Sequence, residues 1–213
     1  MAIAIVTVIA SLYLGFPPER QKLVILYVNQ GNGVVNGSGF GAMLSFASSE
    51  HFNTVFFQVY REGKLLFSPS TLHSFVNQAH QARLRIFFAL YLTNVSQTVP
   101  ESIYELGEDG VSLDMSTLNQ SSQQFLLASL KSGFKGETAV TTTDPHSSLR
   151  PDLLVLETYF VNYRRFIKPG IVASVEVAAT TDSQDYESQY HYALQNSDGV
   201  LVFDYAGLLK AGY

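Results

Sequence analysis

The sequence predicts a single small (β/α)₈ barrel, in which a closed parallel sheet of eight strands is surrounded by helices. The chain has 213 residues, of which 46% are hydrophobic, enough for one sizeable core and close to the lower length limit of such barrels. After Arg20, short β-branched and aromatic runs alternate with stretches of helical spacing. No linker, low-complexity tract or charge run divides this pattern, so we expect one domain.

The amino-terminal residues 1–16 form an unbroken apolar stretch without charge, which ends abruptly at Pro17 and Pro18. It is shorter than the roughly 20 residues that a membrane-spanning helix needs, but it fits the core of a signal peptide or the remnant of an anchor. A buried segment that caps the barrel floor is the alternative. We therefore expect the barrel domain to cover residues 17–213 and any membrane contact to involve residues 1–16 alone.

Eight apolar runs are expected to form the strands of the barrel. They cover residues 23–29, 54–60, 85–91, 110–116, 137–143, 152–159, 171–179 and 199–205. The helical stretches between them cover residues 39–51, 70–82, 121–132, 160–167 and 186–196, while the third and fifth connections show only a weak pattern. Apolar strands separated by helices indicate a parallel sheet, and eight such units favour closure into a barrel. An open doubly wound sheet is the alternative.

Acidic side chains end four of the predicted strands, at the edge where barrels of this kind carry their functional groups. Asp114 ends the fourth run and shares its alternation with the small Ser112, which predicts that it points into the barrel mouth. Glu157, Glu176 and Asp204 follow apolar residues in the last three runs. Burying such charges is costly unless they are paired or used, although each acid can also simply cap a helix or bind an Arg. Asp204 is the strongest candidate for a structural role.

Carboxyl groups gathered at an apolar mouth suit the hydrolysis of a glycosidic bond. This reaction needs one protonated carboxyl as the acid and one ionised carboxylate as nucleophile or base. We expect Asp114 to be the nucleophile or base, and Glu157 or Glu176 to be the acid. Aromatic and polar neighbours are expected to contact sugar rings and hydroxyls. These candidate substrate-binding residues are Asn29, Gln58, Tyr60, Tyr91, Tyr159, Asp204 and Tyr205.

Composition and motifs argue against other functions. The net charge is -5 and the basic residues are scattered, so we expect no nucleic acid partner. The five histidines form no His-X-His pair on a predicted strand, and no lysine ends a strand, which disfavours a metal site and Schiff-base chemistry. The glycines of residues 31–41 do not complete a nucleotide fingerprint. We therefore expect no metal and no cofactor, and a carbohydrate as the partner.

Two strand motifs resemble glycoside-hydrolase-like barrel families. Residues 52–60 read FNTVFFQVY and residues 62–67 read EGKLLF, which is similar to a second-strand NTVFFQVR run of those families. Residues 109–114 read DGVSLD and resemble a fourth-strand DGxxLD motif, which is shared with the endo-alpha-1,4-polygalactosaminidase family. The last Asp of that motif is catalytic in the family, so the resemblance implies a catalytic role for Asp114.

Further positions refine this resemblance. The segment 152–159 is similar to the sixth strand of the polygalactosaminidase family, which has a glutamate in the place of Glu157. Tyr60 stands where the first families have an arginine. Ser116 stands at the acid position of the chitinase pattern DGxDxDxE, which argues against a chitinase mechanism.

The sequence thus predicts a glycosidase that acts on an extracellular or cell-envelope polysaccharide. Three Asn-X-Ser sequons, at positions 36, 94 and 119, favour an extracellular or cell-surface location, with the cytoplasm as the alternative. The rival function is a non-catalytic barrel that binds carbohydrate or serves as a structural module of the cell envelope. The shortness of most loops after the strands favours this rival.

Overall fold

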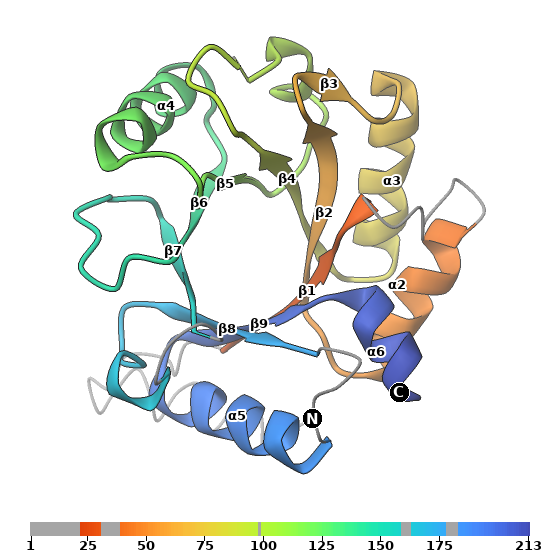
Figure 1. Cartoon of the computed structure of the whole chain (residues 1–213). Helices are drawn as coiled ribbons and strands as arrows, with labels where there is room; N and C mark the ends of the chain where they lie inside the picture. The colour runs from red at the N-terminus through yellow and green to blue at the C-terminus, as the bar shows by residue number, and fades with distance from the viewer. Residues whose placement is uncertain (1–21, 31–38, 98, 159–162, 178–182) are drawn as a thin grey trace, which may run out of the picture.

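The computed structural model shows a closed barrel of parallel strands with helices on its outside (Figure 1). It describes residues 22–30, 39–97, 99–158, 163–177 and 183–213. The order of the strands is β1-β9-β8-β7-β6-β5-β4-β2, and β1 also pairs with β2, which closes the ring. The predicted (β/α)₈ barrel is therefore confirmed, and the open doubly wound sheet is excluded. The apolar segment 1–16 lies outside the described residues.

Each of the eight predicted runs overlaps one barrel strand. The strands are β1 (Leu23–Val28), β2 (Thr54–Arg61), β4 (Arg85–Tyr91), β5 (Gly110–Asp114), β6 (Glu137–Thr142), β7 (Leu153–Glu157), β8 (Val172–Glu176) and β9 (Gly199–Phe203). A two-residue strand, β3 (Lys64–Leu65), pairs antiparallel with the end of β2 outside the ring.

The helices of the outer layer are α2 (Gly39–Ser49), α3 (Pro69–Gln81), α4 (Gln120–Gly133), α5 (Ser183–Asn196) and α6 (Tyr205–Ala211), with short 3₁₀ turns at η2 (Glu101–Ile103) and η3 (Tyr163–Arg165). The predicted helix over 160–167 contains only η3 in its described part. Helix α6 begins where the sequence predicted the last strand to end. Among the described helices, none is both long enough and apolar enough to cross a membrane.

Alternation along the strands produces two apolar cores, because successive side chains point into the barrel and out toward the helices. The inner core consists of Ile25, Tyr27, Phe56, Phe87, Ala89, Ala139, Val155, Val172 and Leu201. The larger outer core lies between the sheet and the helices. In it, the rings of Phe40 on α2 and Phe75 on α3 stack with centroids 4.0 Å apart. A side chain near the carboxyl end of a strand therefore reaches the barrel mouth when it lies on the same face as the inner-core residues of that strand.

Side-chain caps set the start of the described helices that follow β5 and β9. Asn119 accepts a hydrogen bond from the Ser122 N–H at 2.9 Å and begins α4. Asp204 accepts one from the Gly207 N–H at 2.9 Å and begins α6. Such caps satisfy N–H groups that have no partner within the helix. Asp204 thus has the structural role that the sequence favoured for it.

Candidate functional site

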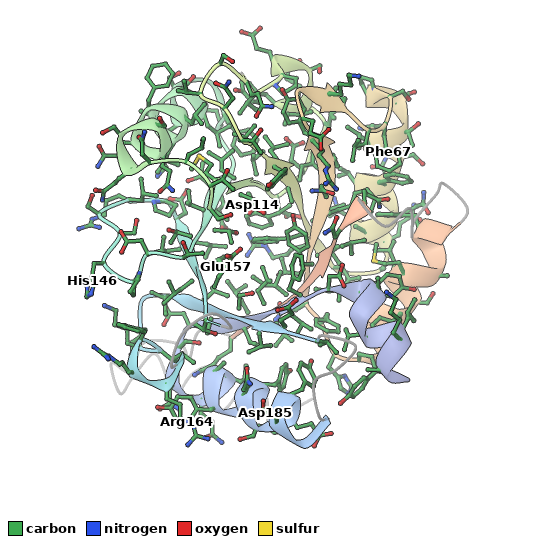
Figure 2. The ribbon with its side chains drawn as sticks, viewed as in Figure 1. Phe67, Asp114, His146, Glu157, Arg164 and Asp185 are labelled. Atoms are coloured by element: carbon green, nitrogen blue, oxygen red, sulfur yellow. The ribbon has the colours of Figure 1, made fainter. Side chains whose placement is uncertain are left out.

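The carboxyl ends of the strands surround a cavity of about 310 Å³. Its wall is formed by Tyr27, Asn29, Gln58, Arg61, Tyr91, Asp114, Ser116, Glu157 and Phe203. Figure 2 shows Asp114 and Glu157 inside the ring of strands, whereas His146, Arg164 and Asp185 lie outside it. Barrel enzymes place their active sites at this end of the sheet. The cavity is therefore the candidate active site.

Asp114 is the last residue of β5 and faces the barrel interior, as its alternation with Ser112 predicted. Its Oδ1 accepts a hydrogen bond from the Ser116 hydroxyl at 3.2 Å and a longer one from the Ser116 N–H at 3.5 Å. Burial raises the pKa of Asp114, and the two bonds from Ser116 oppose this rise because they stabilise the ionised form. The carboxyl group is thus oriented by its own loop.

Glu157 is the last residue of β7 and lies on the same face as Val155, so it also points inward. Only 9% of the residue is exposed to solvent. The next residue, Thr158, donates its hydroxyl to the Ser174 carbonyl of β8 at 2.5 Å, which ties the ends of the two strands together. This tie holds the backbone next to Glu157 and places its carboxyl in the cavity wall.

Glu176 ends β8 on the same inward face as Val172 and Ser174. All three predicted catalytic acids therefore lie at one end of the barrel. The wall of the cavity contains Asp114 and Glu157, while Glu176 lies beyond it, next to Phe203 in the register of β9. Burial raises the pKa of Glu176, and the charge of Asp204 adds to this rise.

Three of the predicted substrate-binding residues, Asn29, Gln58 and Tyr91, line the cavity. Oε1 of Gln58 accepts a hydrogen bond from the Gln30 N–H at 3.0 Å, which fixes the orientation of its amide. Tyr91 is the register neighbour of Asp114 on β4. A ligand in the cavity would therefore meet an aromatic ring beside one carboxylate and amide groups on the opposite side of β4.

The other predicted binding residues lie elsewhere. Tyr60 and Tyr205 are buried in the outer core, and Tyr205 packs against Phe46 with ring centroids 5.2 Å apart. Asp204 is the cap of α6, and Tyr159 lies outside the described residues. Tyr60 faces outward because the register between β2 and β4 shifts between Gln58 and Tyr60. This β-bulge places Val59 and Tyr60 together in the outer core and turns Arg61 into the cavity.

Four residues of the cavity wall were not among the predicted site residues, namely Tyr27, Arg61, Ser116 and Phe203. Of these, Tyr27 has a pKa that several charges of the site affect. Burial raises its pKa well above the ordinary value, and the charges of Asp114, Glu157 and Asp204 add to the rise, whereas Arg61 opposes it. Tyr27 therefore stays a neutral phenol whose hydroxyl can donate a hydrogen bond. Tyr27 lies two residues before Asn29 and so on the same face of the strand, which was the signal in the sequence that could have placed it in the site. Because it stands within an apolar run, however, its position predicts only a core residue.

The chemistry of the wall suits acid–base work. Within the described ranges, no group of three or more His, Cys, Asp and Glu side chains has the arrangement of a metal site. The wall combines two carboxyl groups, a guanidinium, two phenols and two amides. Such a set can transfer a proton, offer a carboxylate to a carbon centre and bind hydroxyl groups.

A second hollow of about 310 Å³ lies outside the ring, between α2, α5 and the end of the chain. Its lining includes Phe46, Tyr186, Tyr190 and Glu187. We place the candidate site at the mouth instead, because that cavity is bordered by the ends of several strands and contains two inward-facing carboxyl groups.

Comparisons with known proteins show the fold. No protein-family model and no curated protein matches the sequence. The structure is similar to tryptophan synthase from M. tuberculosis, with a TM-score of 0.57, 13% identity, and coverage of 85% of this chain and 83% of that one. It is similar to an O-GlcNAc hydrolase of Thermobaculum terrenum, with a TM-score of 0.55, 9% identity, and coverage of 86% and 54%.

A third similar structure is the spore cortex-lytic enzyme SleL of Bacillus cereus, with a TM-score of 0.50, 11% identity, and coverage of 75% of this chain and 52% of that one. The chain spans about half the length of these last two proteins. Glycoside hydrolases are thus among the structural neighbours, together with an enzyme of amino-acid synthesis. At these identities the likeness shows the barrel fold alone.

Proposed function

We propose that the protein is a glycoside hydrolase that cleaves a polysaccharide at the mouth of its barrel. The observation that carries the proposal is that Asp114 and Glu157, from β5 and β7, line one cavity together with Tyr27, Tyr91 and polar side chains. Glycoside hydrolysis requires two carboxyl groups at one site. The structural likeness to an O-GlcNAc hydrolase is compatible with this chemistry.

Asp114 acts as the nucleophile or base, because the two donors of Ser116 stabilise and orient its ionised form. Glu157 acts as the acid and protonates the leaving oxygen, and Glu176 is the second candidate for this role. The neutral hydroxyl of Tyr27 donates a hydrogen bond to the sugar or to a carboxylate beside it. The ring of Tyr91 supplies an apolar face for a sugar next to Asp114.

The test is the release of reducing ends from a panel of polysaccharides, including galactosaminoglycans, by the wild type, Asp114→Asn and Glu157→Gln. We expect release by the wild type that falls by a factor of about 10² to 10⁴ in both variants. Asp185→Asn is the matched control, since it neutralises an exposed acid on α5 outside the ring. Circular dichroism and thermal unfolding check that all variants are folded. Equal release by the wild type and both site variants would contradict the proposal.

A non-catalytic carbohydrate-binding barrel is the second candidate function, and the size of the cavity favours it. A volume of about 310 Å³ lies at the lower end of the range for ligand sites, so the wall encloses little of a sugar chain. This function predicts that oligosaccharides bind to the wild type without release and that Asp114→Asn binds them equally well. Binding measured by calorimetry alongside the release assay separates the two functions.

A further inference from the structure

Arg61 lies in the cavity wall because of the β-bulge of β2. With regular alternation after Gln58, residue 60 would face the mouth and residue 61 would face the helices. The register shift between Gln58 and Tyr60 reverses this, and Arg61 pairs with Tyr91 of β4. The bulge thus places a cation in a site that otherwise contains two acids.

The guanidinium of Arg61 uses few of its donors within the protein. Its Nε donates to Oε1 of Glu62 at 3.3 Å, and this is its one ion pair within the described part of the chain. The guanidinium also lies over the ring of Tyr91, 5.8 Å from the centroid. Its side chain is 39% exposed, and that of Glu62 is 70% exposed, so solvent screens their pairing. The two terminal amino groups therefore remain available to a ligand.

Arg61 and Asp114 lie two strands apart in the barrel, on either side of Tyr91. Arg61 pairs with Tyr91, and Tyr91 pairs with Asp114, so the three residues form one row across β2, β4 and β5. Neighbouring strands lie about 4.8 Å apart, which puts the backbones of Arg61 and Asp114 roughly 10 Å apart. A sugar ring beside Tyr91 would have its substituents between the cation and the catalytic carboxylate.

We propose that Arg61 forms an anion subsite beside the acid pair, and that the substrate is an anionic glycan carrying a carboxylate, sulfate or phosphate. This inference rests on the proposed function. Arginine matches such groups because its planar fork donates two parallel hydrogen bonds. The ionised carboxylate of Asp114 repels an anion on the opposite side of the cavity. The charged group of the sugar must therefore lie toward Arg61 and β2.

Binding calorimetry on the uncleaving Asp114→Asn protein tests this subsite. The probes are uronic acid, sulfated and phosphorylated oligosaccharides, each paired with its carboxyl-reduced, desulfated or dephosphorylated counterpart. We expect one anionic class to bind roughly 10- to 100-fold more tightly than its neutral counterpart. Adding Arg61→Ala should remove that difference, Arg61→Lys should keep part of it, and the class that responds identifies the anion.

Glu62→Gln is the matched control, because it removes the negative charge paired with Arg61 and leaves the guanidinium in place. Its preference for the anionic probe should be unchanged or larger. Equal affinity for charged and neutral probes, or a preference that survives Arg61→Ala, overturns the anion subsite. If the wild type still releases reducing ends from a polysaccharide, the proposed function stands without it. Absence of both binding and release overturns the subsite and the proposed function together.

Discussion

The two ends of the barrel both carry charged side chains, but they use them differently. At the floor, where the strands begin, Arg85 of β4 bonds to Glu137 of β6 across β5 with 2.7 Å between Nη2 and Oε1. Asp152, just before β7, accepts hydrogen bonds from both the N–H and the hydroxyl of Thr138, each at 2.8 Å. At the mouth, the one ion pair of Arg61 in the described chain is with an exposed residue of its own turn.

The pKa values of two aspartates show the same difference. Burial opposes the ionisation of Asp152, but the donors of Thr138 and the charge of Lys131 outweigh it, and its pKa is lowered. Burial also opposes the ionisation of Asp114, and there the donors of Ser116 do not outweigh it, so its pKa is raised. The floor charges connect different strands, whereas we propose that the mouth charges serve a ligand. Stability and function should therefore respond to different substitutions.

The largest effect that we expect is at the mouth, on the proposed cleavage of a glycosidic bond. If Glu157 is the acid, Glu157→Gln should lower kcat by about 10² to 10⁴ on the natural polysaccharide. It should recover most of its activity on a dinitrophenyl glycoside of the same sugar, because that leaving group needs no proton. Asp114→Asn should be inactive on both substrates, which serves as the comparison. Recovery by Asp114→Asn instead would assign the acid role to Asp114.

Glu108, just before β5, differs from Asp152 at the floor because its pKa is raised rather than lowered. The pH dependence of stability that it causes should be the second-largest effect. The side-chain oxygens of Glu108 are buried, and this burial raises its pKa to about 7, although the backbone N–H groups of Glu108 and Leu106 oppose the rise. Because this value lies above that of the unfolded chain, the folded protein binds the proton more tightly, and stability is lost as the pH rises from about 4.5 to 7. Glu108→Gln should remove this dependence.

The measurement is the free energy of unfolding of the wild type and Glu108→Gln by urea at pH 4.5 and pH 8. We expect the difference between the two proteins to change by about 3 kcal/mol in favour of the variant at the higher pH. Glu105→Gln, at an exposed position in the same connection, is the control and should show no such change. A constant difference across the two pH values would show that Glu108 is solvated in the folded protein.

Much of the fold could be predicted from the sequence, because strands buried on both faces read as short apolar runs. The residues of the motif DGVSLD have separate roles at the two ends of β5. Asp109 accepts hydrogen bonds from the Ile86 N–H and from His80 at the floor. Gly110 leaves room for the Phe87 ring, which would lie 2.1 Å from an added Cβ. Asp114 then reaches the mouth, so one short segment serves both ends of the barrel.

The site could be predicted only as far as regular alternation holds. Position at the carboxyl end of a run placed Glu157, Gln58 and Tyr91 at the mouth, and alternation with Ser112 placed Asp114 there. The prediction failed for Tyr60 because a bulge adds one residue to β2. This bulge appears in the pairing of β2 with β4, so the local sequence of β2 does not reveal it. Sequence reasoning missed Tyr27 because the carboxylates around it come from other strands. Within its own apolar run, Tyr27 looks the same as a core aromatic residue. Long-range neighbours, rather than local pattern, decide these positions.

The floor should give a moderate effect on stability and none on function. Asp152→Ala removes the acceptor of both Thr138 bonds at the start of β7. We expect a loss of about 1 kcal/mol in the free energy of unfolding at pH 7, because the carboxylate is partly exposed and screened. The pKa of Asp152 is lowered in the folded state, so the loss should shrink as the pH falls through the pKa of the unfolded aspartate and vanish below the lowered pKa of the folded state. Loss of activity per folded molecule would contradict the separation of floor and mouth.

The smallest effect should come from Ser116, which contacts Asp114 without being an acid or base itself. Ser116→Ala removes the hydroxyl that donates to Oδ1 and leaves the longer bond from the backbone N–H. Since the lost bond favours the ionised form, the pKa of Asp114 should rise further, and the acidic limb of the kcat/KM profile should move up by roughly 0.5 to 1 pH unit. Ser116→Thr keeps the hydroxyl and should restore the limb, whereas a merely structural role would lower activity equally at every pH. A limb that stays in place would mean that Asp114 does not act as the base.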